Sequence, residues 1–201
     1  MNKVMLFFAA FCFSGILFAQ DIALPEPQKT GGKPLLDALS ERSSTREFSE
    51  KELDTQTLSN LLWAAYGFNR SDKRVVPSSQ NRQEIDLYVV LKSGVYFYDA
   101  KDNKLIEKVK GDHRKSAGKQ DFVHTAPLNV ILVANLDKAS NRDAGYIDSG
   151  FIVQDIYLYC ASEGNLGSVV RGYIDKDEIK KLLNLTEQQE VTIAQTVGYK
   201  K

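Results

Sequence analysis

The stretch Leu128-Asn-Val-Ile-Leu-Val-Ala134 carries the strongest indication of how this chain folds. It is nearly all apolar, it contains β-branched residues, and it is shorter than a typical helix. Such a run predicts a strand that is covered on both faces by other parts of the chain.

The residues before this strand predict a hairpin region. The two-residue period of a strand appears in four apolar residues, Ile85, Leu87, Val89 and Leu91. Turns at Ser93-Gly94 and Asp102-Asn103 then separate two further apolar runs, which begin at Val95 and Leu105. We interpret residues 85–106 as neighbouring strands joined by short turns.

Other parts of the chain complete the sheet and leave one segment open. Residues 166–173 and the apolar positions between Val191 and Val197 indicate two more strands. The polar stretch from Gly111 to Gln120 is compatible with either a helix or a loop. Asp175 and Glu178 have the spacing of a capping box, which predicts the start of a helix.

Two segments have a clear helical period. Leu58, Leu61, Leu62 and Ala65 recur at one face, Asp54 is a candidate N-cap and Gly67 a candidate stop, so we predict a helix over 55–66. A second helix is predicted over 148–163, with apolar residues so frequent that it should lie in the protein's centre or at a subunit interface. The overall pattern is an α+β domain whose helices flank a mainly antiparallel sheet.

Composition fits one domain and excludes some partners. The chain has 201 residues, of which 43% are hydrophobic, which is enough for one sizeable core. Acidic and basic residues number 26 each, so nothing indicates a nucleic-acid partner or a basic membrane-binding face. Cys160 lies in a helical apolar run and is interpreted as a small core residue. We predict no metal site, because neither histidine lies among other ligand residues.

The N-terminus predicts export. Lys3 precedes an apolar run from Val4 to Phe18, and Ala19 supplies a small residue before a polar segment. This is the pattern of a secretory signal peptide, here residues 1–20, and the run is short for a spanning helix. We therefore expect a periplasmic or secreted protein with no stable membrane span after cleavage. The Pro- and Gly-rich residues 21–34 predict a linker or N-terminal arm outside the core, followed by one domain over 35–201.

Three polar clusters lie between the regular elements. The first, residues 41–48, holds two arginines four positions apart with three hydroxyl residues between them, which suits an anion such as phosphate. The second, residues 77–83, is a Pro-initiated turn rich in amides and hydroxyls. The third comprises Gly164 to Gly167, Arg171-Gly172 and the terminal lysines, where glycine permits close approach of a ligand to the backbone. Each cluster alone also occurs in ordinary turns and helix ends.

Taken in order, these motifs give a resemblance. Arg42-Ser-Ser-Thr-Arg46-x-Phe48, Leu61-Leu-Trp-Ala-Ala-Tyr-Gly67, Pro77-Ser-Ser79, Asp148-Ser-Gly150 and Val197-Gly198-Tyr199 occur in the order seen in the nitroreductase superfamily. The series is most similar to the SagB-type branch of oxidases and dehydrogenases, and it covers nearly all of residues 33–199. The resemblance implies a nitroreductase-like fold, an intertwined homodimer and FMN as the cofactor.

The resemblance also implies roles for individual residues. Arg42 and Ser44, with Ser43 close by, would hold the FMN phosphate, and Arg46 would lie near the flavin pyrimidine ring, where it would tune the flavin during catalysis. A second set would contact the flavin elsewhere: Pro77, Ser78, Ser79 and Asn81 from across the dimer interface, the amide of Gln120, the backbone of Arg171 and Gly172, and a terminal lysine, assigned here as Lys201 although Lys200 is an alternative.

The activity implied is an FMN-dependent oxidoreductase. Hydride would pass from a reduced donor, such as a reduced nicotinamide, through flavin N5 to a small acceptor such as a nitroaromatic or a quinone. Two alternatives remain open: a SagB-type azoline dehydrogenase and a non-catalytic flavin-binding protein. The predicted export argues against the azoline dehydrogenase, because the peptides it would oxidise are normally modified inside the cell.

Overall fold

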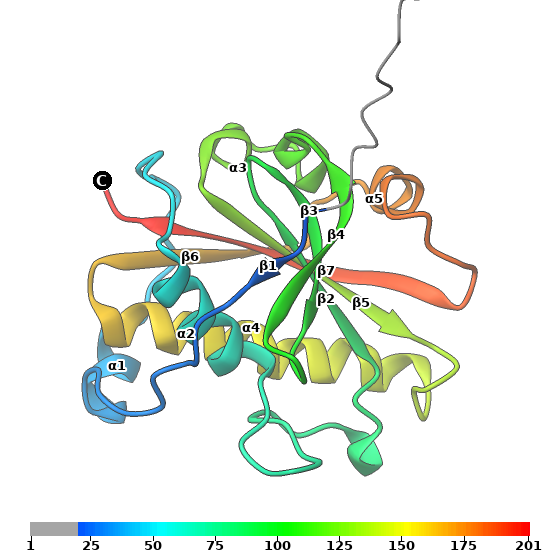
Figure 1. The fold of residues 1–201 in the computed structure, drawn as a ribbon, viewed down its shortest axis with the longest axis horizontal. Helices are drawn as coiled ribbons and strands as arrows, with labels where there is room; N and C mark the ends of the chain where they lie inside the picture. The colour runs from blue at the N-terminus through cyan, green and yellow to red at the C-terminus, as the bar shows by residue number, and fades with distance from the viewer. Residues whose placement is uncertain (1–19) are drawn as a thin grey trace, which may run out of the picture.

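The computed structural model describes residues 20–201 as one seven-stranded sheet with helices on both faces (Figure 1). The predicted signal peptide therefore lies outside the described residues, except for Gln20. The strand order is β1-β4-β3-β2-β5-β7-β6, and every pair of neighbours is antiparallel. The strands are β1 (Ile22–Ala23), β2 (Ile85–Val90), β3 (Gly94–Asp99), β4 (Lys104–Lys110), β5 (Leu128–Asn135), β6 (Leu166–Arg171) and β7 (Gln189–Tyr199).

The helices form two layers. In the view of Figure 1, α1, α2 and α4 lie below the sheet, and α3 and α5 lie above it. Their bounds are α1 (Leu35–Glu41), α2 (Thr55–Tyr66), α3 (Asp121–Thr125), α4 (Arg142–Glu163) and α5 (Lys176–Leu182). Two short 3₁₀ turns, η1 (Ser79–Asn81) and η2 (Arg114–Ala117), complete the elements, and η2 settles the polar stretch that the sequence left open. The α+β fold with a mainly antiparallel sheet is confirmed.

The strand β5 is covered on both faces, as its sequence predicts. Val130 and Leu132 belong to the core beneath α2 and α4. Ile131 and Val133 point the other way, into the core beneath α3, α5 and η2. All four side chains are fully buried, because alternate residues of a strand face opposite sides and both sides carry helices here.

Helix ends follow their capping residues. The helix α2 spans the predicted residues, and the Asp54 carboxylate accepts from the Thr57 N–H at 2.8 Å. In the same way Asp175 accepts from the Glu178 N–H at 3.1 Å at the start of α5. The helix α4 begins six residues earlier than predicted, at Arg142, where Asn141 is the cap. The first turn of α4 is polar, so the helical repeat of apolar residues does not extend into it. Only the cap residue Asn141 could have indicated where the helix begins.

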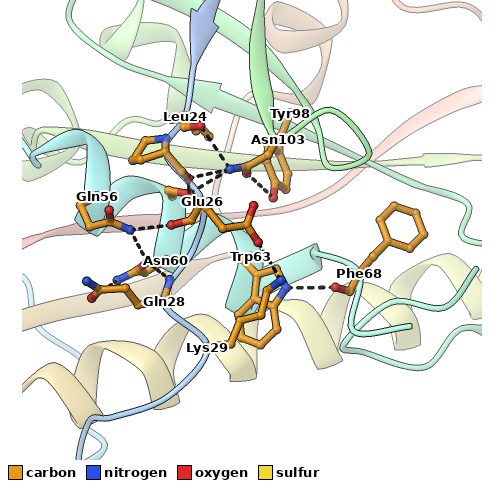
Figure 2. Close-up of polar contacts among 12 residues, drawn as sticks. Leu24, Glu26, Gln28, Lys29, Gln56, Asn60, Trp63, Phe68, Tyr98 and Asn103 are labelled. Carbon is orange, nitrogen blue, oxygen red and sulfur yellow. Dashed lines mark hydrogen bonds and ion pairs between the residues drawn. The ribbon is translucent and has the colours of Figure 1, made fainter. Parts of the chain in front are cut away.

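The N-terminal arm contributes more to the core than its composition predicts. The strand β1 pairs with β4, and Leu24 is buried against the α2 face of the sheet, so the expectation that this segment stays outside the core is wrong. Figure 2 shows the arm lying across α2 and the β3–β4 turn. The Pro25 carbonyl accepts from Asn103, and the Glu26 carbonyl accepts from Gln56. Side chains of the domain thus satisfy the backbone of the arm, which allows an extended, proline-containing segment to dock.

The helix α4 crosses the whole lower face of the sheet and is apolar on both of its sides. Ile152, Ile156 and Cys160 face inward and are buried, which confirms Cys160 as a core residue. Ile147 and Phe151 face outward and are exposed. No helix within residues 20–201 is long and apolar enough to cross a membrane.

Candidate functional site

The first polar cluster lies along β6, the edge strand of the sheet. Ser44 forms a parallel bridge with Ser168, and the Thr45 N–H donates to the Ser168 carbonyl at 2.9 Å. Thr45 packs so closely on Gly167 that a Cβ there would lie 2.6 Å from the Thr45 Oγ1. Further along, the Ser49 N–H donates to the Tyr199 carbonyl. The segment is therefore held against the edge of the sheet as an additional, irregular strand.

Tyr157 of α4 joins this segment to the sheet. Its hydroxyl lies 2.9 Å from the Ser44 Oγ and accepts from the Val170 N–H at 2.9 Å. The guanidinium of Arg42 stacks over the same ring, 5.1 Å from its centroid. Sequence reasoning missed Tyr157, although a tyrosine on a largely apolar helix signals that its hydroxyl needs a polar partner.

The cluster has the chemistry of an anion site. Arg42 is half-buried and Ser43 and Ser44 are exposed, so one cation and two hydroxyls remain open to a ligand. Lys200 lines a small recess together with Ser43, while its ammonium donates to the Gly164 carbonyl at 3.0 Å. Lys201 and Arg46 are exposed, so their predicted contacts stay predictions.

The other end of β6 carries a second group of predicted residues. Ser168 and Arg171 are three residues apart on the strand, which corresponds to about 10 Å. The Arg171 guanidinium is buried beneath residues 117–118, where it donates to the Ala117 carbonyl at 2.7 Å. Close to it, the Gln120 Oε1 is buried without any hydrogen-bond partner. A buried acceptor without a partner is unusual and marks a position where a ligand donor would be favourable.

The cluster at residues 77–81 lies elsewhere in the chain. The Ser79 N–H donates to Asp148 Oδ2 at 3.1 Å, near the start of α4. Asp148 and Tyr157 are nine residues apart on this helix, or about 13 Å. Gln80 and Asn81 adopt left-handed backbone conformations with φ of 55° and 57°, which are strained for non-glycine residues. Within one chain, residues 42–46 lie along β6, and Arg171 and the nearby Gln120 lie towards the end of the same strand. Residues 77–81 instead contact the start of α4.

A pair of buried carboxyl groups lies beneath this loop. Glu84 is fully buried, and neither of its carboxyl oxygens has a hydrogen-bond partner of ordinary geometry. Burial, and then the neighbouring Asp148, raise the pKa of Glu84 to about 7. Asp148, which accepts the hydrogen bond from the Ser79 N–H, therefore lies next to a carboxyl group that stays protonated up to about pH 7.

This pair predicts a pH-dependent stability. The folded protein holds the Glu84 proton up to a pKa of about 7, whereas the unfolded chain releases it near the ordinary glutamate pKa of 4.5. Between these values the unfolded state binds fewer protons, so the free energy of unfolding should fall as pH rises, by on the order of 3 kcal/mol, and level off above the folded pKa. Denaturant titrations of the wild type and of Glu84→Gln measure this, since the variant lacks the titrating group. Parallel pH profiles for the two proteins would contradict the assignment.

Four cavities of about 370 to 520 Å³ are lined by residues other than the predicted ligand residues. One cavity, of about 520 Å³, is lined by Trp63, Phe68 and Tyr98, with exposed charges of both signs at its rim. The recess that includes Ser43 and Ser168 has only about 10 Å³. The predicted ligand residues instead form an open surface that a second molecule could close.

A large apolar surface lies on the same side of the sheet as α4. The large hydrophobic residues exposed on α4 and α1 include Ile147, at 59% exposure, and Leu36, at 76%. A groove between the two helices is lined by Leu35 of α1 and Leu158 of α4. Monomeric soluble proteins rarely expose apolar patches of this kind, so the surface is suited to contact another protein chain.

Comparisons with known proteins agree with one another. The family model described as "Nitroreductase family" matches residues 39–199. A nitroreductase homologue of Methanocaldococcus jannaschii is 30% identical over 186 residues, covering 83% of this chain and 91% of the relative. The crystal structure of a nitroreductase homologue from Ralstonia eutropha JMP134 has a TM-score of 0.84 at 39% identity and covers 90% of each chain.

One more distant structure bears on the fold alone. A protein of Clostridium difficile R20291, described as an FMN-dependent nitroreductase, has a TM-score of 0.60 at 21% identity. The structural match covers 83% of this chain and 87% of the Clostridium difficile chain.

Proposed function

This chain belongs to the nitroreductase family of oxidoreductases, and we propose that it works as an FMN-dependent homodimer. The observation that carries this proposal is the arrangement along β6. An anion-binding group of Arg42, Ser43 and Ser44 lies at one end, and the unpartnered amide oxygen of Gln120 lies towards the other. A phosphorylated, flat molecule matches this order of groups.

The residues present fit the cofactor chemically. Arginine with neighbouring hydroxyls suits a phosphate dianion. The buried Gln120 Oε1 needs a donor, which a ribityl hydroxyl or a ring N–H supplies. Gly172 has no atom within 4 Å of the position that a Cβ would occupy, so the backbone there is open to a ligand. Bound FMN would supply the ring that accepts and passes on hydride.

A homodimer would complete the site. The predicted flavin residues Pro77, Ser78, Ser79 and Asn81 lie apart from β6 in their own chain, so a partner would have to bring its copy of this loop to the site. The exposed apolar side chains of α1 and α4 supply a surface that would be buried when two subunits associate. A self-complementary contact through α4 would present each loop to the other subunit.

The chain's own residues would then bind and orient rather than react. Arg42 and the two serines hold the phosphate end, and Tyr157 fixes Ser44 in place. Arg46, on the same segment, is assigned to the electrostatic tuning of the ring. Reduced nicotinamide or another reduced donor, and a small acceptor such as a nitroaromatic or quinone, are proposed as the reactants. The predicted signal peptide adds export to the periplasm or the exterior.

The visible spectrum of the purified protein tests this proposal. A chain expressed without residues 1–20 should show oxidised flavin, and the released cofactor should have the mass of FMN. Photoreduction without oxygen, followed by a screen of acceptors, then separates an enzyme from a flavin-binding protein, because only an enzyme's flavin reoxidises rapidly. Folded, colourless protein that takes up no added FMN would refute the proposal.

Removing the Tyr157 hydroxyl should weaken FMN binding. Tyr157→Phe keeps the ring under Arg42 but loses the hydrogen bonds to Ser44 and Val170. We expect FMN affinity to fall about fivefold to tenfold, since one hydrogen bond contributes about 1 kcal/mol. Fluorescence titration with FMN measures this. Tyr159→Phe, on the same helix, is the matched control and should bind FMN as the wild type does.

A further inference from the structure

The buried guanidinium of Arg171 makes only neutral contacts. Its side chain lies at the end of β6, and the residue is 4% exposed. The Nε donates to Thr196 Oγ1 at 2.9 Å, Nη1 donates to the Ala117 carbonyl at 2.7 Å, and Nη2 donates to Asn129 Oδ1 at 3.2 Å. These contacts join η2 to the strands β5, β6 and β7, but none of them offsets the charge.

Arg171 has no counter-ion among residues 20–201. No ion pair of that part of the chain includes it. Burial lowers the pKa of Arg171 to about 10, so the side chain remains a cation at neutral pH. A buried charge without a partner is costly to folding, and neutral side chains would fill such a place at lower cost. Its presence therefore calls for an electrostatic role.

The charge lies in the wall of the proposed ring site. A Cβ on Gly118 would collide with the Arg171 guanidinium and would also lie 3.2 Å from the Gln120 Oε1. Both groups are thus packed around the same glycine. On the other side, Gly172 follows Arg171 directly and is open to a ligand. The two segments proposed to contact the flavin ring, Gln120 and residues 171–172, therefore adjoin the guanidinium, one in space and the other along the chain.

We propose that Arg171 is a redox-tuning residue, whose buried charge favours the reduced form of the flavin. This inference rests on the proposed function. Two-electron-reduced flavin is an anion at neutral pH, whereas oxidised flavin is neutral, so a nearby cation stabilises the reduced form selectively. At a separation of about 10 Å and an effective dielectric constant of about 20, one unit charge changes such an equilibrium roughly tenfold. The exposed Arg46 is screened by solvent and salt, so its long-range effect is weaker.

Asn129→Asp tests the charge without removing the arginine. The new carboxylate would stand where Oδ1 already accepts from Arg171 and Thr196, and it would supply the missing counter-ion. We expect the ratio of reduced to oxidised flavin at a fixed potential to fall about tenfold, which for a two-electron couple is about 30 mV. Asn129→Thr is the matched control, because it loses the same donor to the Val123 carbonyl without adding charge. In this variant the ratio of reduced to oxidised flavin at a fixed potential should stay within about threefold of the wild-type ratio.

Variants of Arg171 itself provide the second arm. Arg171→Gln should shift the midpoint potential of the flavin in the same direction as Asn129→Asp, whereas Arg171→Lys should keep the wild-type potential. Both substitutions of Arg171 should lower the melting temperature. Potentials are measured on FMN-loaded protein against a reference dye. Asn129→Asp and Arg171→Gln change the local charge, whereas Asn129→Thr and Arg171→Lys conserve it. Equal shifts of the potential in both pairs, or no shift in any variant, would leave Arg171 a structural residue and overturn the inference. A wild type that binds no FMN overturns the proposed function, and this inference with it.

Discussion

Phe151→Asp is expected to convert the proposed dimer into monomers and to abolish FMN binding at the same time. Phe151 is exposed on the outer face of α4, within the apolar surface that α1 extends. In a symmetric dimer the substitution occurs twice, and each buried carboxylate costs several kcal/mol of association free energy. We therefore expect the dissociation constant to rise by roughly a thousandfold or more.

The loss of FMN should follow from the loss of the partner. The loop at residues 77–81 does not reach β6 in its own chain, so a monomer would hold only the part of the site that Arg42 and Gln120 supply. Sedimentation velocity and the flavin spectrum, recorded on the same samples, measure both effects. Asn184→Asp, in an exposed turn after α5, adds the same charge and should remain dimeric and yellow. A Phe151→Asp protein that is dimeric with full FMN content would exclude α4 from the interface.

Arg42→Ala is expected to weaken FMN binding about a hundredfold while riboflavin binding stays nearly constant. The guanidinium is held over Tyr157 beside two exposed hydroxyls, in a position suited to a phosphate. Losing a charge-assisted, bidentate contact costs on the order of 3 kcal/mol. Riboflavin has no phosphate, so it cannot lose this contact.

The comparison of the two ligands separates a phosphate contact from a general effect on folding. Titrations with FMN and with riboflavin are performed on the wild type, on Arg42→Ala and on Lys181→Ala. The last removes an equal charge from the exposed face of α5 and should bind both ligands normally. Equal losses of FMN and riboflavin affinity in Arg42→Ala would show that Arg42 supports the fold of the segment rather than the phosphate.

Local patterns explain how much of the site could be predicted. The arginines, serines and prolines of the three clusters are recognisable because turns and anion sites use few residue types at fixed spacing. Tyr157, Asn129 and Thr196 could not be found in this way, since they act on residues far along the chain. Their roles depend on which strands and helices become neighbours.

The amino-acid sequence by itself determined the type of most elements and the ends of a few. The bounds of α2, the cap at Asp175 and the two-sided burial of β5 follow from period, capping and apolar content, which act over a few residues. Only the tertiary structure decided that Leu24 enters the core, that residues 42–46 lie along β6, and that the Arg171 charge is buried without a counter-ion. These facts depend on contacts between distant segments, and burial and electrostatic energy are set by the whole surroundings of a side chain rather than by its neighbours in the chain.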